Sequence, residues 1–183
     1  MSPSTIDTFS RAGAPQIEFD RSVSLTRDAT RKAYGYWKSV TGDRPWPSRK
    51  DISPRGMKDF VKHIGLIEVR PGRLSPTYAV RIAGGIVENV FGSIGGKTLS
   101  EFLPASIEAR WRIIFDTMLE ARAPIRISTR VSFGGRDYLA TEALIAPLGE
   151  PDGISMILAA VDIWPAVAPA QPGRPAGPGE RTA

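Results

Sequence analysis

The last third of the chain constrains the fold most. Residues 126–133 alternate apolar and polar side chains, and residues 154–164 form an almost continuous apolar run. A further strand is predicted over residues 138–148, and short turns at 134–137 and 150–153 separate the three. Alternation bounded by turn residues is the signal of β-hairpins, and Pro-Asp-Gly suits a tight turn. The sequence therefore predicts three consecutive antiparallel strands.

Helical spacing dominates two other segments. Apolar residues recur every three or four positions along residues 104–121, which predicts a long helix. A first helix, capped by Ser24 or Thr26, is predicted to end near Val40 because Gly and Pro follow it. The remaining predicted elements are a short helix over 53–62, a strand pair over 64–70 and 77–83, and short helices over 86–91 and 99–102.

Such a segregated order of helices and strands is typical of the α+β class. We expect one five-stranded antiparallel sheet with helices on one face, and an N-terminal helix at its edge or on the other face. The folded domain is predicted over residues 23–164. Residues 1–22 are expected to be weakly ordered, and the Pro/Ala/Gly-rich residues 165–183 to be disordered.

Composition excludes several kinds of chemistry. There is no cysteine, so the chain lacks a thiol nucleophile, a disulfide framework and cysteine metal ligands. Its one histidine, His63, excludes a multi-histidine metal site. No apolar stretch approaches the roughly 20 residues that cross a bilayer, and no export signal is visible at the N-terminus. We therefore expect a cytoplasmic protein without a membrane span, and the composition argues against most common catalytic chemistries.

The net charge of +5 lies entirely in the first third of the chain. Residues 1–63 hold 12 Lys/Arg against 7 Asp/Glu, whereas residues 64–183 hold 12 of each. A basic patch can meet nucleic acid, a membrane surface or an acidic protein. Acidic residues interleave here, however, and no nucleic-acid recognition motif is present. A solvated helix face is the preferred interpretation, and nucleic acid is not an expected partner.

Three local sequence motifs, together with the order of the predicted elements, indicate a resemblance to a known family. The run Tyr36–Pro54 holds a Tyr-Trp pair and a P-x-R-x-D-I-x-P segment, and Ala79–Gly84 ends in R-x-A-G. The run Val90–Phe102 holds a Phe-Gly pair and a later L-x-E. Over about residues 28–162 the chain resembles PAS domains, and in particular a bacterial stand-alone PAS subfamily long known only as a domain of unknown function. Gly85 departs from that pattern, which commonly has a small polar residue.

The resemblance implies a sensor or adaptor, not an enzyme, with a cavity between a curved sheet and its helices. PAS ligands include haem, flavin, carboxylates and lipids, and some members bind none, so the cofactor stays unknown. Cysteinyl-flavin chemistry needs a cysteine, and His63 lies outside the region of the usual haem ligands, so neither is expected. The resemblance also implies a signalling protein as partner and a homodimer formed through the N-terminal helix or the outer sheet face.

Candidate site residues follow from these expectations. Arg81 either faces the cavity and binds an anion, or faces outward and pairs with Glu142 or Glu68. Tyr34 and Trp37 are assigned to an exposed interaction face. The candidate ligand pocket comprises Tyr78, Val80, Ile82, Trp111, Phe115, Ile127, Thr129, Leu139 and Met156.

Three functions remain open from the sequence. The first is a sensor that binds a small ligand and passes its state through the N-terminal helix. The second is a ligand-free dimeric interaction module with a filled core. The third is an enzyme of the nuclear-transport-factor type, which would need a His–Asp pair in its cavity, and the position of His63 counts against it.

Overall fold

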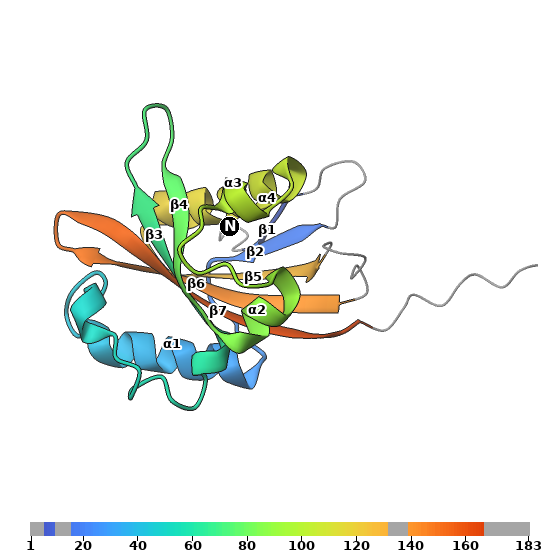
Figure 1. The fold of residues 1–183 in the computed structure, drawn as a ribbon. Coiled ribbons are helices and arrows are strands. Elements are labelled where there is room, and N and C mark those ends of the chain that lie inside the picture. The colour runs from blue at the N-terminus through green and yellow to red at the C-terminus, as the bar shows by residue number, and fades with distance from the viewer. Residues whose placement is uncertain (1–5, 10–15, 132–138, 167–183) are drawn as a thin grey trace, which may run out of the picture.

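The structure, a computed structural model, describes residues 6–9, 16–131 and 139–166. Figure 1 shows a curved antiparallel sheet with helices on both of its faces. The sheet has seven strands in the order β1-β2-β5-β6-β7-β3-β4. The strands are β1 (Ile6–Phe9), β2 (Ile17–Asp20), β3 (Ile64–Arg70), β4 (Thr77–Ala83), β5 (Ile125–Val131), β6 (Leu139–Glu150) and β7 (Gly153–Pro165).

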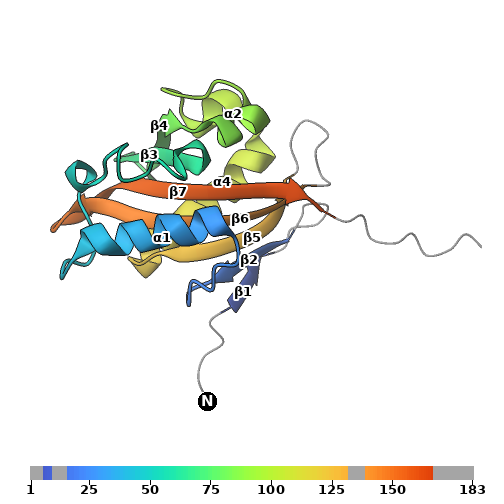
Figure 2. The ribbon, with the colours of Figure 1, turned by 90° about the horizontal axis from the view of Figure 1, so that it is seen from below.

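The helices divide between the two faces of the sheet. The first helix, α1, lies across β6 and β7 on one face, and the others lie on the opposite face (Figures 1 and 2). The α+β class is thus confirmed, and the N-terminal helix takes the second of its two expected places. The helices are α1 (Asp28–Thr41), α2 (Gly85–Phe91), α3 (Leu99–Phe102) and α4 (Ala105–Ala121), with 3-10 turns η1 (Arg49–Asp51) and η2 (Val61–His63).

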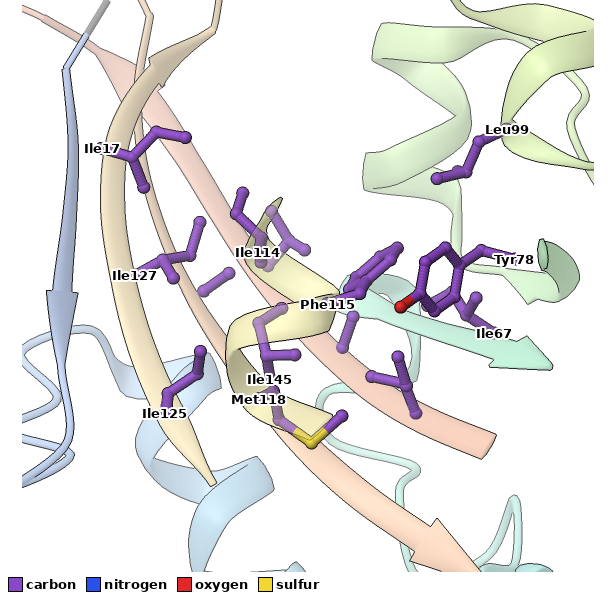
Figure 3. Packing of buried hydrophobic residues seen from close by; sticks show 14 of the residues in the cluster. Ile17, Ile67, Tyr78, Leu99, Ile114, Phe115, Met118, Ile125, Ile127 and Ile145 are labelled. Atoms are coloured by element: carbon purple, nitrogen blue, oxygen red, sulfur yellow. The ribbon is translucent and has the colours of Figure 1, made fainter. Parts of the chain in front are cut away.

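Each face of the sheet carries its own apolar core. In the α4-side core, Phe115 of α4 packs against Tyr78 of β4 with ring centroids 5.0 Å apart (Figure 3). In the α1-side core, Ala33 and Trp37 of α1 pack against Leu144 and the other inward residues of that face. β6 and β7 contribute alternate residues to both cores. This explains why residues 154–164 are apolar at almost every position.

The sheet is wider than the five strands expected. β2 pairs antiparallel with β5, and β1 pairs with β2, so the sheet extends beyond β5. Ile17 and Phe19 are buried in the α4-side core. Residues 17–20, which precede the predicted start of the folded domain at residue 23, thus form part of the sheet. Four-residue strands carry too little alternation to be recognised by pattern, and β2 is stabilised by pairing with β1 and β5 and by the burial of Ile17 and Phe19.

The helix expected over residues 53–62 is replaced by isolated turns and η2. The backbone N–H of Phe60 donates to the Met57 oxygen, and that of His63 donates to the Phe60 oxygen, which are three-residue rather than α-helical steps. Met57 and Phe60 are nevertheless buried in the α1-side core. Burial of these two side chains therefore does not require a regular helix over residues 53–62.

Candidate functional site

A row of small residues opens a cavity between the sheet and α2–α4. Ala83 of β4, Gly65 of β3 and Ala159 of β7 are paired in register across three strands. All three line the same cavity, whose volume is about 60 Å³. These side chains are too short to fill the gap between the sheet and the helices that pack on it. The cavity is therefore a consequence of the strand register.

The roof of the cavity is aromatic. The ring of Phe91 in α2 packs edge-on against that of Trp111 in α4, with centroids 6.2 Å apart. Trp111 also packs against Phe115, with centroids 5.7 Å apart. Every lining side chain is apolar, which suits an apolar ligand group. The lining consists of Gly65, Ile67, Val80, Ala83, Val87, Phe91, Ile94, Leu99, Phe102, Leu103, Trp111, Phe115, Ala159, Val161 and Ile163.

A second pocket of about 50 Å³ adjoins the cavity and is polar at one side. The two share Phe91, Trp111, Val161 and Ile163 as walls. The second pocket adds four polar residues, namely Arg110, Thr129, Arg130 and Thr141. The two pockets therefore lie side by side, and the second forms a polar end beside the apolar cavity.

Arg110 of α4 reaches down to the strands at this polar end. Its Nη2 donates to Thr129 Oγ1 at 3.0 Å, and Thr129 Oγ1 in turn donates to the Gln16 carbonyl oxygen at 2.8 Å. Thr129 of β5 pairs across the sheet with Thr141 of β6. Burial lowers the pKa of the Arg110 guanidinium. A charged group is thus held against a largely apolar site.

The structure brings together four of the nine predicted pocket residues. Val80, Trp111 and Phe115 line the cavity, and Thr129 and Trp111 line the polar pocket. Tyr78 and Ile127 are fully buried in the α4-side core but line neither pocket. Leu139, at the start of β6, is half-buried and likewise lines neither of them.

The structure places Ile82 and Met156 away from the cavity. Ile67 pairs with Val80 and Leu66 with Ile82, so Arg81 is an extra residue that reverses the alternation of β4. Ile82 therefore faces away from Val80 and is 44 % exposed. Met156 packs against the α1-side core. Since β7 is apolar on both faces, its sequence gave no indication of which residues face α4.

Arg81 faces outward, as one of the two expected arrangements had it. Its Nη1 lies 3.8 Å from the Glu68 carboxylate on the neighbouring strand, and its side chain is 57 % exposed. An exposed pair at this distance contributes little stability. Arg81 lines neither pocket described above, so an anion-binding role in the cavity is wrong for this residue.

Trp37 does not belong to an exposed interaction face. It is buried in the α1-side core, and its Nε1–H donates to the Pro147 carbonyl oxygen at 2.9 Å. Tyr34 is half-buried, stacks on Trp37 at 6.3 Å between ring centroids, and lies under the Lys38 ammonium group. Of the two aromatic residues, only Tyr34 is accessible to a partner.

His63 links two elements of the fold. Its Nδ1–H donates to the Val161 carbonyl oxygen at 2.9 Å, and Asp162 lies 3.8 Å from the same nitrogen. The ring thus ties η2 to β7. It lies outside both pockets. Among the described residues, no group of three or more histidine, aspartate or glutamate side chains is placed to hold a metal ion.

Glu142 of β6 joins the sheet to α1. Its carboxylate accepts hydrogen bonds from the Arg27 N–H at 3.0 Å, from Thr30 Oγ1 at 2.6 Å and from Thr26 Oγ1 at 2.7 Å. Arg126 Nε donates to it from β5 at 3.0 Å. Burial alone would raise the pKa of Glu142, but these bonds outweigh burial and lower it to about 2. A carboxylate from the sheet therefore caps the helix, in place of the expected Ser24 or Thr26.

Sequence reasoning missed Arg110 and Thr141, and it considered Glu142 only as a partner of Arg81, a place that Glu68 takes instead. Arg110 sits on a helix whose apolar spacing drew attention to its neighbour Trp111. Thr141 and Glu142 lie in a strand that is apolar from Ala143 to Leu148. A glutamate inside a central strand was the available signal, because burial of a carboxylate requires several donors.

Comparison with known proteins identifies a family. A family model described as "PAS domain" matches residues 25–161, which is most of the chain. No curated protein and no solved structure matched the chain. Within the described residues, none of the helices has the length and apolar character needed to cross a membrane.

Proposed function

Because this chain belongs to the PAS domain family, we propose that it is a non-enzymatic sensor or adaptor. It binds a small, largely apolar ligand in the cavity beneath α2–α4. It passes the bound state to a signalling protein through α1. The single observation that carries the proposal is the cavity floored by Ala83, Gly65 and Ala159.

The two central strands support a route from ligand to helix. Val161 of β7 lines the cavity, whereas its neighbour Ala160 packs on the α1 side. Thr141 of β6 lines the polar pocket, whereas Glu142 caps α1. A ligand changes the population of a conformation only when it binds two states differently. In this proposal the two states differ in how β6 and β7 hold α1.

The partner surface in this proposal is the outer face of α1. The α1 helix and the segment that follows it cover the sheet face from which dimerisation was expected. Arg31, Lys32 and Lys38 are exposed on α1, beside the half-buried Tyr34. A basic helix face suits an acidic surface on a partner protein.

A cavity-filling variant tests the sensor function. Ala83→Leu adds three carbons to the floor of the cavity, and Ile82→Leu, on the neighbouring position that faces away, is the matched control. Native and denaturing mass spectra of each full-length protein show whether a small molecule is bound. A thermal-shift screen then measures how far small apolar compounds raise the melting temperature of each protein. We expect binding by the wild type and by Ile82→Leu, and its loss in Ala83→Leu. Equal behaviour of all three proteins would contradict a ligand in this cavity.

A ligand-free dimeric module is the second candidate, and exposed apolar side chains favour it. Leu74, between β3 and β4, is 99 % exposed, and Val61 and Ile82 are 42 % and 44 % exposed. Sedimentation velocity of the wild type and of a Leu74→Ser, Ile82→Ser double variant tests this candidate. It requires a dimer that the double variant lacks, and a monomeric wild type would contradict it.

A further inference from the structure

Two polar atoms at the polar end of the cavity lack partners. Arg110 Nη1 and Thr141 Oγ1 are shielded from solvent, and neither has a hydrogen-bond partner within the described part of the chain. Both residues line the same pocket. The Thr141 residue is only 3 % exposed. Their closeness in one pocket distinguishes them from unsatisfied groups scattered through a core.

Leaving such groups unpaired is unfavourable. A buried donor without an acceptor carries its full desolvation cost, and a charged donor carries more than a neutral one. The other amino group of Arg110 is already bonded to Thr129. The described residues therefore leave one charged donor and one hydroxyl aimed at the same space, and an anionic acceptor would satisfy both.

We propose that the site binds a small monocarboxylate, a deepening that rests on the sensor function proposed above. One carboxylate oxygen accepts from Arg110 Nη1 and the other from Thr141 Oγ1. The apolar body of the ligand lies in the adjoining cavity against Trp111 and Phe91, the walls that the two pockets share. Arg110 and Thr141 thereby become specificity-determining residues.

The size of the space limits the apolar body. The two pockets measure about 60 and 50 Å³, whereas a cavity of about 150 Å³ accepts benzene. A chain of about four carbons suits this space better than a long fatty acid. Because Arg130 is exposed to solvent, Arg110 supplies the one shielded positive charge of the pocket. A single half-buried cation suits a monoanion rather than a phosphate dianion.

Calorimetric titration of the full chain with butanoate and its neutral isostere butanamide tests the charge requirement. We expect butanoate to bind the wild type at least about tenfold more tightly than butanamide, since one charged hydrogen bond accounts for such a factor. Arg110→Met should remove that preference. Thr141→Val, which keeps the side-chain shape, should weaken butanoate binding severalfold. Arg55→Met, at an exposed residue between η1 and η2, changes the net charge equally and should change nothing.

The outcomes separate this inference from the sensor function. Equal binding of butanoate and butanamide, or an unchanged preference in Arg110→Met, would overturn the carboxylate site while leaving a cavity ligand in place. No butanoate binding at millimolar concentration would overturn it as well. The Ala83→Leu comparison judges the sensor function independently, because it uses apolar compounds without a charged group.

Discussion

Thr141 and Glu142 are consecutive on β6 and serve opposite faces of the sheet. Thr141 Oγ1 lies in the polar pocket under α4, and the Glu142 carboxylate caps α1 on the other side. A displacement of β6 by a ligand at Thr141 would move the group that holds the start of α1. In the proposed sensor, one residue of backbone would thus separate the ligand from α1, without a chain of intermediate side chains.

Replacing the capping carboxylate should destabilise the protein. Glu142→Gln removes a buried charge that Arg126 and the start of α1 require, and we expect a loss of about 3 kcal/mol in the free energy of unfolding at pH 7. Urea denaturation measures this loss. Glu18→Gln is the matched control, because Glu18 is bonded to the same arginine but is 45 % exposed. The control should cost less than about 1 kcal/mol.

Acid should unfold the wild type through the same residue. The folded pKa of about 2 lies below the ordinary value of 4.5, so the ionised carboxylate stabilises the fold fully above about pH 5. This stabilisation, at most about 3 kcal/mol, is lost as the pH falls through the folded pKa. Denaturation curves at pH 7, 5, 4 and 3 should show a flatter profile for Glu142→Gln. Parallel profiles of the two proteins would contradict the assignment.

Replacement of threonine by valine should affect stability in opposite ways at positions 141 and 30. Thr141→Val removes a hydroxyl that has no partner within the described residues, so we expect the free energy of unfolding to stay equal or to rise by up to about 1 kcal/mol. Thr30→Val removes a donor to Glu142 at 2.6 Å and should cost about 1–2 kcal/mol. Thermal denaturation of both variants checks the sign. A loss of stability in Thr141→Val would mean that its hydroxyl is bonded in solution.

Trp37 and Tyr34 of α1 should differ in their contribution to stability. Trp37 is 6 % exposed and hydrogen-bonded, so Trp37→Ala should cost about 3–5 kcal/mol. Tyr34 is half-buried, so Tyr34→Ala should lower the free energy of unfolding by only about 1 kcal/mol. Urea denaturation compares them. Similar losses would argue against the burial difference described for α1.

Gly84 and Gly85, at the start of α2, should differ in how well they tolerate replacement by alanine. A Cβ at Gly84 would lie 2.5 Å from the backbone oxygens of Val61 and Lys62, whereas a Cβ at Gly85 would have nothing within 4 Å. We expect Gly84→Ala to cost at least about 2 kcal/mol. Gly85→Ala should be neutral or stabilise α2 by up to about 1 kcal/mol. Melting temperatures of the two variants measure the contrast.

Pattern analysis anticipated those features that have a local cause. The hairpin of β3 and β4 and the long helix α4 carry clear periodicity, and the structure has them within one residue of the expected bounds. Val80, Trp111 and Phe115 were assigned to the cavity because alternation and helical spacing fix their side.

Other features depend on contacts between distant segments. The extra residue Arg81 in β4 is defined only by its pairing with β3, so Ile82 was assigned to the wrong face. The orientation of β7 could not be read from a strand that is apolar on both faces, which misplaced Met156. The burial of Trp37 depends on the Pro147 carbonyl, 110 residues away.

The cap on α1 also bears on the order in which the protein assembles. Arg27, at the N-cap position, makes no side-chain cap, and the group that does the capping comes 115 residues later in the chain. An isolated helix of 14 residues is marginal in water. During synthesis, α1 should therefore remain unformed until β6 has left the ribosome and joined the sheet. A peptide spanning residues 23–42 should accordingly show little helix by circular dichroism.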